Sequence, residues 1–195
     1  MKGIIKDCLI LFVITLIAGA ALGVVYEVTK EPIAAQEAKK KVEAQQGVFA
    51  EADAFDAVEL DEAIVATVAT NGVTIDEAFD AKAAGAHVGY VIQATSPNGY
   101  GGNITLMVGV TADGTCNGYS LLTINETAGL GMNAKNADWA AQFAGKAVEA
   151  FEVTKLGASA DNQVDAISGA TITSNAVTEA VNACIAYANA MEGGN

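Results

Sequence analysis

Residues 88–124 read VGYVIQATSPNGYGGNITLMVGVTADGTCNGYSLLTI, and this stretch decides the fold. Three runs rich in β-branched residues are each long enough for a strand: 88–95, 104–111 and 116–124. The segment 96–102 is rich in glycine and indicates a loop, and Asp113-Gly114 is typical of a tight hairpin turn. The pattern predicts consecutive antiparallel strands.

The flanking segments indicate helices and a few short elements. Pro32 suits the first turn of a helix that runs to about residue 50 and forms a stalk near the membrane. Residues 175–191 carry the apolar stripe of a second helix: Val177, Val181, Cys184, Ile185 and Ala188. Shorter elements are one or two strands within residues 55–75, where short apolar runs lie around 63–68, a helical turn at 78–84, and a short helix marked by Trp139, Phe143 and Val148. Antiparallel strands with helices set apart predict an α+β fold with a small, mostly antiparallel sheet.

Residues 9–25 contain no charged side chain and predict a single transmembrane helix. Together with Cys8 and Tyr26 they form a 19-residue apolar segment. At ~1.5 Å per residue it spans about 28 Å, close to the ~30 Å of a bilayer core. Because the run continues past the possible cleavage triplet 18–20, we favour a retained anchor over a signal peptide that is removed.

Lysines flank the apolar run on both sides, so the distribution of positive charge leaves the orientation open. The short tail before the run resembles a signal-anchor, which would place most of the chain outside the cytoplasm. Gly19 and Gly23 have the spacing that lets a second helix approach closely, although small residues are common in membrane helices. We expect three parts: the tail and anchor at 1–30, the stalk helix and short elements at 31–84, and the main domain at 85–195.

The charge balance excludes several classes of function. The 195 residues carry 10 basic and 23 acidic side chains, for a formal net charge of −13, and none of the basic ones is arginine. So acidic a chain is unsuited to nucleic acid. With a single histidine, His87, it cannot build a histidine-rich metal site. Cys8, Cys116 and Cys184 are too scattered for an iron–sulfur cluster and are expected to be buried apolar residues, as is Trp139.

Residues 165–174, DAISGATITS, lead directly into the C-terminal helix. Gly169 and Ala170 leave the backbone open to close approach by a ligand, and Thr173 or Ser174 is suited to cap the helix. The first amides of a helix favour an anion, so this turn is a candidate phosphate site that needs no arginine. An ordinary capped loop would have the same composition, and both interpretations stand at this point.

The run Ser168-Gly169-Ala170-Thr171, followed by Thr173-Ser174, resembles the flavinylation motif of FMN-binding domains in the G subunit of the Rnf ion-translocating electron transport complex. The C subunit of the sodium-pumping NADH:quinone oxidoreductase carries a similar motif. The resemblance implies that a flavin transferase attaches FMN to Thr171 through a phosphoester bond.

Two further stretches resemble the same family: the glycine loop 99–102, and Glu126-Thr127-Ala128-Gly129-Leu130-Gly131, in which Ala128 replaces the usual proline. They imply that the flavin ring lies between residues 100–103, the loop 126–131 and the Thr171 turn. Glu126 would bond the flavin or fix its own loop, and Leu130 would form an apolar wall or belong to the core. The implied cofactor-binding set is Thr171 with Tyr100, Gly101, Gly102, Glu126, Thr127, Gly129, Leu130, Ser168, Gly169, Ala170, Thr173 and Ser174.

By this resemblance the chain is an electron-transfer subunit with covalent FMN, in a membrane ferredoxin:NAD⁺ oxidoreductase that moves Na⁺ or H⁺. It would pass electrons between neighbouring centres without itself oxidising NADH or ferredoxin. Its partners would be the other membrane subunits and, during maturation, the flavin transferase. The alternatives are a subunit of a sodium-pumping quinone reductase, a stand-alone extracytoplasmic flavoprotein, and an anchored binding domain without redox function.

Overall fold

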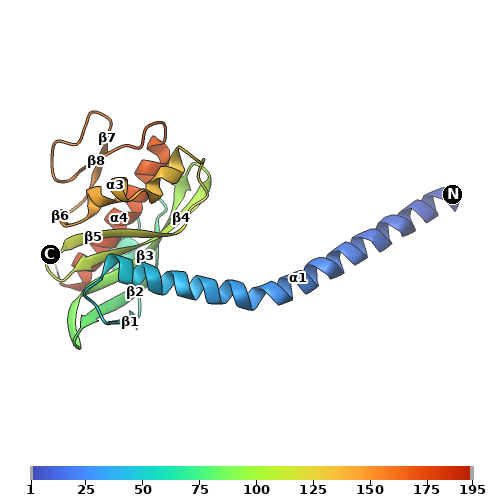
Figure 1. The fold of residues 1–195 in the computed structure, drawn as a ribbon, viewed down its shortest axis with the longest axis horizontal. Coiled ribbons are helices and arrows are strands. Elements are labelled where there is room, and N and C mark those ends of the chain that lie inside the picture. Colours follow the sequence, from blue (N-terminus) through green and yellow to red (C-terminus); the bar gives the residue numbers. More distant parts are fainter. Residues whose placement is uncertain (1, 194–195) are drawn as a thin grey trace. The chain divides into compact units, whose positions relative to one another are not determined.

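The computed structural model describes residues 2–193 and divides into two compact units, residues 1–41 and 42–195. The first unit is the longer part of helix α1 (Lys2–Val48), drawn in blue in Figure 1. By length and composition this helix is able to cross a membrane. Its most apolar 18-residue window has a mean hydropathy of 2.8, and no part of that window is buried within the chain.

The predicted stalk helix is part of α1 and not a separate element. The helix continues through Pro32, which lies in its interior and not in a first turn. A proline removes one backbone donor from a helix, and the bonds of the neighbouring turns remain. The prediction that a new helix begins at Pro32 is therefore wrong.

The second unit is built on a six-stranded antiparallel sheet in which the order in space follows the order along the chain. Its strands are β1 (Ala54–Val58), β2 (Thr74–Ala83), β3 (Ala86–Gly99), β4 (Gly102–Thr111), β5 (Thr115–Thr123) and β6 (Lys146–Ala147). The three predicted strands are confirmed as β3, β4 and β5, with the predicted hairpin turn at Asp113-Gly114. β3 extends through most of the predicted loop, because Gly99 still pairs with Gly102.

Of the one or two short strands predicted within residues 55–75, β1 forms one, but the apolar run 63–68 is not a strand, and the helical turn predicted at 78–84 is wrong. Residues 63–68 belong to helix α2 (Glu62–Val68), which Asp61 caps by accepting the amide protons of Ala63 and Ile64. Residues 78–83 belong to strand β2, which pairs with β3 over almost its whole length. The expected domain boundary at 84/85 thus falls in a hairpin turn within the compact unit.

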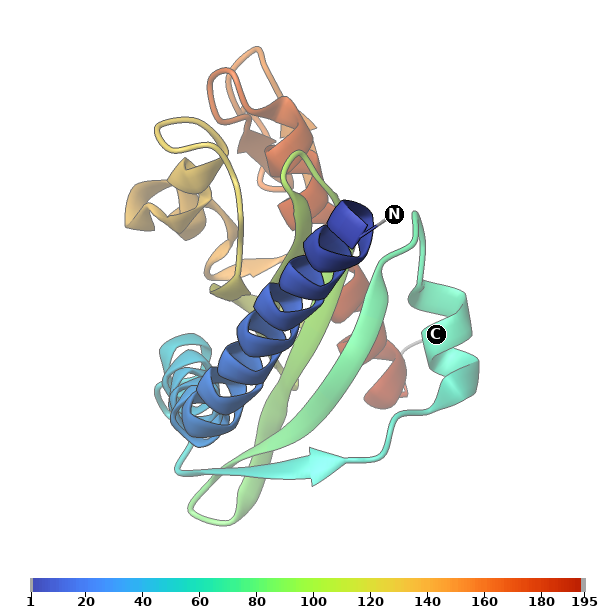
Figure 2. The ribbon, with the colours of Figure 1, turned by 90° about the vertical axis from the view of Figure 1, so that its right-hand side faces the viewer.

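Helix α4 (Thr171–Met191) covers one face of the sheet (Figure 2) and buries the whole predicted apolar stripe. It begins four residues before the predicted start at residue 175. On the opposite face, Val48 and Phe49 at the end of α1 pack against Val91 and Met107. The sheet therefore has an apolar layer on each side.

The chain between β5 and α4 forms short elements. These are η1 (Gly131–Lys135), α3 (Ala137–Ala140), η2 (Ala141–Phe143), and the parallel strands β7 (Glu152–Thr154) and β8 (Gln163–Asp165). Trp139 and Phe143 lie on the helical part and are buried, as predicted, whereas Val148 lies beyond it. Strand β8 leads directly to the turn before α4.

Candidate functional site

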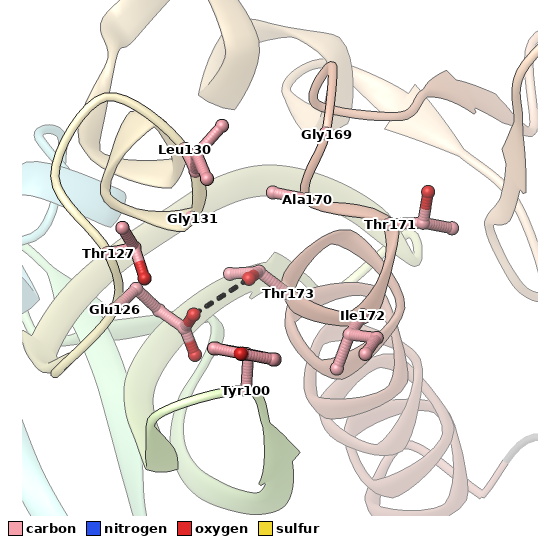
Figure 3. A pocket seen from close by; sticks show the side chains of 10 residues that line it. All are labelled: Tyr100, Glu126, Thr127, Leu130, Gly131, Gly169, Ala170, Thr171, Ile172 and Thr173. Carbon is pink, nitrogen blue, oxygen red and sulfur yellow. Dashed lines mark hydrogen bonds between the residues drawn. The ribbon is translucent and has the colours of Figure 1, made fainter.

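A cavity of about 600 Å³ lies at the N-terminal end of α4. Three segments form its walls (Figure 3): the β3–β4 turn, the loop from β5 into η1, and the turn into α4. The volume is within the range of roughly 300–1,000 Å³ that small-molecule pockets occupy. Its lining residues are Tyr100, Glu126, Thr127, Leu130, Gly131, Gly169, Ala170, Thr171, Ile172 and Thr173.

Glu126 connects the three walls. One carboxylate oxygen accepts a hydrogen bond from the Thr173 hydroxyl at 2.9 Å, and the other accepts the amide proton of Gly101 at 3.1 Å. A Cβ added at Gly131 would lie 2.5 Å from the Glu126 carboxylate, and one at Gly99 would lie 2.8 Å from it. Glycine at both positions thus leaves room for the carboxylate, which is the only charged group among the lining residues.

The turn into α4 is fixed by Ser174. Its hydroxyl accepts the amide proton of Ile167 at 2.9 Å and donates to the Ala170 carbonyl at 3.0 Å. Gly169 has a φ of 73°, in the left-handed region that favours glycine. The predicted cap at Thr173 or Ser174 is wrong, because the helix begins at Thr171 and the preceding Ala170 has no side chain with which to cap it.

Within residues 2–193, the amides of Thr171, Ile172 and Thr173 donate no hydrogen bond to the protein. Such free amides at the start of a 21-residue helix carry partial positive charge and favour an anion. All three residues line the cavity. The wall formed by α4 therefore offers free amides suited to an anion, without arginine or lysine.

Thr171 and Thr173 differ in their surroundings. The Thr173 side chain is 1% exposed and its hydroxyl is bonded to Glu126. Thr171 is partly exposed, and its side chain points away from the Glu126–Thr173 bond in Figure 3. Its hydroxyl has no hydrogen-bond partner in the described part of the chain. Of the two, Thr171 has the hydroxyl that is available for chemistry.

The mouth of the cavity is apolar. Tyr100, Leu130 and Ile172 are 72%, 41% and 53% exposed and come from all three walls. Partly exposed apolar side chains around a pocket are suited to the flat face of an aromatic ligand. The cavity thus combines apolar contacts at its rim with an anion-binding helix start.

The structure brings most of the predicted site residues together. Those that line the cavity are Tyr100, Glu126, Thr127, Leu130, Gly169, Ala170, Thr171 and Thr173. Those that lie outside the lining are Gly101, Gly102, Gly129, Ser168 and Ser174, of which Gly101 and Ser174 bond residues of the walls. Sequence reasoning missed Gly131 and Ile172. Gly131 ends the run 126–131 and Ile172 lies between Thr171 and Thr173, so both could have been identified from the motifs that contain them.

The candidates judged unimportant from sequence lie elsewhere. Cys116 and Cys184 are buried, as predicted, whereas Cys8 on α1 is exposed, and that prediction is wrong. Burial raises the pKa of the Cys116 thiol to about 11. Trp139 is 9% exposed and packs edge-to-face with Phe143. No group of three His, Cys, Asp or Glu side chains among residues 2–193 is arranged to hold a metal.

Comparison with known families defines the class of protein. A model of the FMN-binding domain matches residues 99–186, and a model of the RnfG N-terminal region matches residues 1–46. The crystal structure of Shewanella oneidensis NqrC shares the fold, with a TM-score of 0.50 and 19% identity, over 74% of this chain and 70% of that one. The chain thus joins an apolar N-terminal helix to an FMN-binding domain.

Relatives covering nearly the whole chain define the family. The G subunit of the Na⁺-translocating ferredoxin:NAD⁺ oxidoreductase complex of Acetobacterium woodii is 34% identical over 189 residues, 94% of this chain and 91% of the relative. The G subunit of the proton-translocating ferredoxin:NAD⁺ oxidoreductase complex of Clostridium ljungdahlii is 35% identical over 182 residues, 91% and 88% of the two chains. The chain belongs to the RnfG family, the G subunits of the Rnf-type ion-translocating oxidoreductase complexes. This membership and the apolar α1 support a membrane location.

The residues present fit FMN. The start of α4 offers three free amides for its phosphate, and the exposed side chains at the mouth suit its ring system. Thr127 and Thr171 add hydroxyls for its polar chain.

Proposed function

We propose that this chain is the flavin-carrying electron-transfer subunit of an Rnf-type ferredoxin:NAD⁺ oxidoreductase, with FMN bound covalently to Thr171. The names of its full-length relatives support the complex, and the match to the FMN-binding domain supports the cofactor. The partners are the other membrane subunits of that complex. When bound, FMN supplies one- and two-electron chemistry, while the protein supplies its position and surroundings.

The observation that carries the covalent assignment is the position of the Thr171 hydroxyl. It lies at the first residue of α4, beside the free amides of residues 171–173, and it is partly exposed and without a partner in the described part of the chain. A phosphate held by these amides would lie next to that hydroxyl. Thr173 has neither the exposure nor the free hydroxyl.

Attachment requires an activated phosphate donor. A direct condensation of Thr171 with FMN would have to expel water, so the donor is a flavin dinucleotide with a phosphoanhydride bond. The Thr171 oxygen forms the new bond to the FMN phosphorus as the phosphoanhydride bond breaks. The hydroxyl proton passes to a base of a flavin transferase, and a nucleoside monophosphate leaves. No oxidant or reductant is consumed.

Each cavity residue then has a defined task. Glu126 holds the walls in register through its bonds to Thr173 and Gly101. Leu130 and Ile172 would provide apolar contacts for the flavin ring at the mouth. The free amides of α4 would orient the phosphodiester and offset part of its charge.

The soluble domain is proposed to lie on the extracytoplasmic side, held there by α1. The proposed covalent attachment supports this orientation. A covalent bond prevents the cofactor from being lost in a compartment where free FMN is scarce. Cysteine-accessibility labelling from outside intact cells, at a cysteine placed at the exposed Leu156, tests the orientation. Absence of labelling there would refute it.

The test of attachment is co-expression of the full chain with a flavin transferase, followed by a denaturing gel viewed for flavin fluorescence. Wild-type chain is expected to fluoresce, and Thr171→Val is expected to lose the signal. Thr127→Val is the matched control, because Thr127 lines the same cavity with an exposed side chain but lies away from the helix start. Fluorescence that persists in Thr171→Val would show that the acceptor is another residue.

A further inference from the structure

The segment from Asp165 to Thr171 is fixed at both of its ends. Near the helix, Ser174 bonds the amide of Ile167. At the other end, the Asp165 amide donates to Gln142 Oε1 at 2.8 Å, and the Asp165 carbonyl accepts from Trp139 Nε1 at 2.6 Å. Both backbone groups of one peptide residue are thus bonded by side chains from a distant part of the sequence.

These two side chains take the place of a missing strand. Asp165 ends β8, which pairs with β7 on one side and with no other strand among residues 2–193. Successive residues of a strand direct their backbone groups to opposite sides, and Ala166 donates to the Thr154 carbonyl of β7. The backbone groups of Asp165 therefore face the open edge, where Trp139 and Gln142 supply their protein partners.

The Trp139–Gln142 pair is held rigidly. The two residues are three apart on the short helical segment α3–η2, and Gln142 Nε2 also donates to the Trp139 carbonyl at 3.4 Å. The Trp139 ring packs edge-to-face with Phe143 at 5.3 Å and with Tyr119 at 6.2 Å between centroids. Because the donor and acceptor atoms are fixed in advance, they define a single position for Asp165.

The longer stretch from Gly131 to Phe143, which contains α3–η2, also reaches the cavity. It begins with η1, whose first residue is Gly131 in the cavity wall, and it ends with Gln142 and Phe143. It therefore connects the wall that contains Glu126 with the strand that leads to Thr171. The position of the acceptor turn depends on this connection as well as on Ser174.

We propose that Trp139 and Gln142 are positioning residues for FMN attachment, because they hold the Asp165 peptide and so present the Thr171 hydroxyl to the transferase. The inference rests on the proposed covalent attachment at Thr171. Neither residue contacts the reacting atoms. Without their bonds the turn populates several conformations, and the attachment rate falls with the fraction that remains correctly placed.

The test uses the full chain in detergent as substrate of a flavin transferase with a flavin dinucleotide donor. Gln142→Leu keeps the size of the side chain and removes its bonds to the Asp165 amide and to the Trp139 carbonyl. We expect about a tenfold lower kcat/KM for attachment, the order expected for losing the net contribution of one or two hydrogen bonds. Trp139→Phe, which removes the ring donor together with part of the ring volume, is expected to act in the same direction.

Asn182→Leu is the matched control. The Asn182 amide accepts the amide proton of Phe151 at 2.7 Å and donates to its carbonyl at 2.9 Å, so it makes the same two kinds of bond to a residue outside the acceptor turn. We expect Asn182→Leu to lower Tm comparably and to keep the wild-type attachment rate. Gln142→Glu retains an acceptor for the Asp165 amide and is expected to keep most of the rate.

A second measurement needs no flavin. Amide hydrogen exchange of the unmodified chain reports the turn directly at Ile167 and Ala170, whose amides Gln142 does not contact. Both amides are expected to lose protection in Gln142→Leu and to keep it in Asn182→Leu.

The outcomes separate the two proposals. If wild-type chain is modified at Thr171 and Gln142→Leu is modified at the same rate with unchanged exchange, the positioning role is overturned and the attachment site stands. If Asn182→Leu slows attachment as much as Gln142→Leu does, the effect is general destabilisation and the positioning role is again overturned. If wild-type chain is never modified at Thr171, the proposed attachment fails and the positioning role fails with it.

Discussion

Replacing Thr173 with valine removes one hydroxyl and preserves the shape of the side chain. Thr173 is 1% exposed, and its hydroxyl donates to Glu126 at 2.9 Å. The variant leaves one oxygen of a partly buried carboxylate without its protein donor. Losing a hydrogen bond to a charged group costs roughly 1.5–3 kcal/mol, and water at the cavity places the expected value near ~2 kcal/mol. For a domain of this size that loss lowers Tm by about 4–8 °C.

Thermal unfolding of the flavin-free chain measures this loss. Trp139 is the only tryptophan and is packed in the core, so its fluorescence reports the unfolding of the domain. Thr171→Val is the control, since the Thr171 hydroxyl has no partner in residues 2–193, and its Tm is expected to stay within about 1–2 °C of wild type. The pair predicts opposite results: Thr173→Val loses stability, and Thr171→Val loses only the covalent flavin.

A double-mutant cycle identifies the source of the effect. If the bond between Thr173 and Glu126 is responsible, Thr173→Val has little further effect once Glu126 is alanine. A Thr173→Val variant as stable as wild type, or one equally destabilising with and without Glu126, would refute the reasoning that Glu126 joins the cavity walls through this bond.

Two more predictions concern Gly131 and His87. Gly131→Ala places a methyl group 2.5 Å from both the Glu126 carboxylate and the Thr173 hydroxyl, so it is expected to lower Tm. Gly47→Ala is the control, because the added methyl group meets no atom within 4 Å and is expected to leave Tm unchanged or raise it. Equal Tm values for the two variants would contradict this prediction. Burial lowers the pKa of His87, but its hydrogen bonds to Asp80 and Glu192, both 2.5 Å, and the charges of those groups outweigh burial and raise the pKa above 6.5. A raised histidine pKa adds stability that is fully present below pH 6.5 and is lost as pH rises through the folded-state pKa. The free energy of unfolding is therefore expected to fall with pH across that window in wild type, and His87→Gln is expected to remove this slope.

The sheet was predictable because its signals are local. β-Branched runs and the Asp113-Gly114 turn specify β3, β4 and β5 without reference to the rest of the chain. Residues 63–68 and 78–84 were mispredicted because their structure is set by partners. Asp61 caps α2 through a hydrogen bond that an apolar run does not reveal, and β2 is a strand because β3 pairs beside it.

The cavity was predictable where residues form a motif and not where they act through another segment. Thr171 and Glu126 lie in recognisable stretches, but their contacts depend on where α4 begins, and the wrong choice of helix cap moved that point by four residues. The bonds of Trp139 and Gln142 to Asp165 join positions 26 and 23 residues apart. Nothing in the spacing of a tryptophan and a glutamine indicates such a contact, because side-chain bonds to a strand edge have no sequence period.

The absence of arginine acquires a physical explanation from the start of α4. An anionic ligand in a chain of net charge −13 experiences repulsion that a guanidinium would ordinarily offset. Three free amides provide directional donors but only about half a unit charge, which is weak compensation for a phosphate. The proposed covalent bond would make retention independent of that balance, so that electrostatics need only orient the group. This argument favours attachment at the helix start over attachment at Thr127, which lies on another wall without free helical amides.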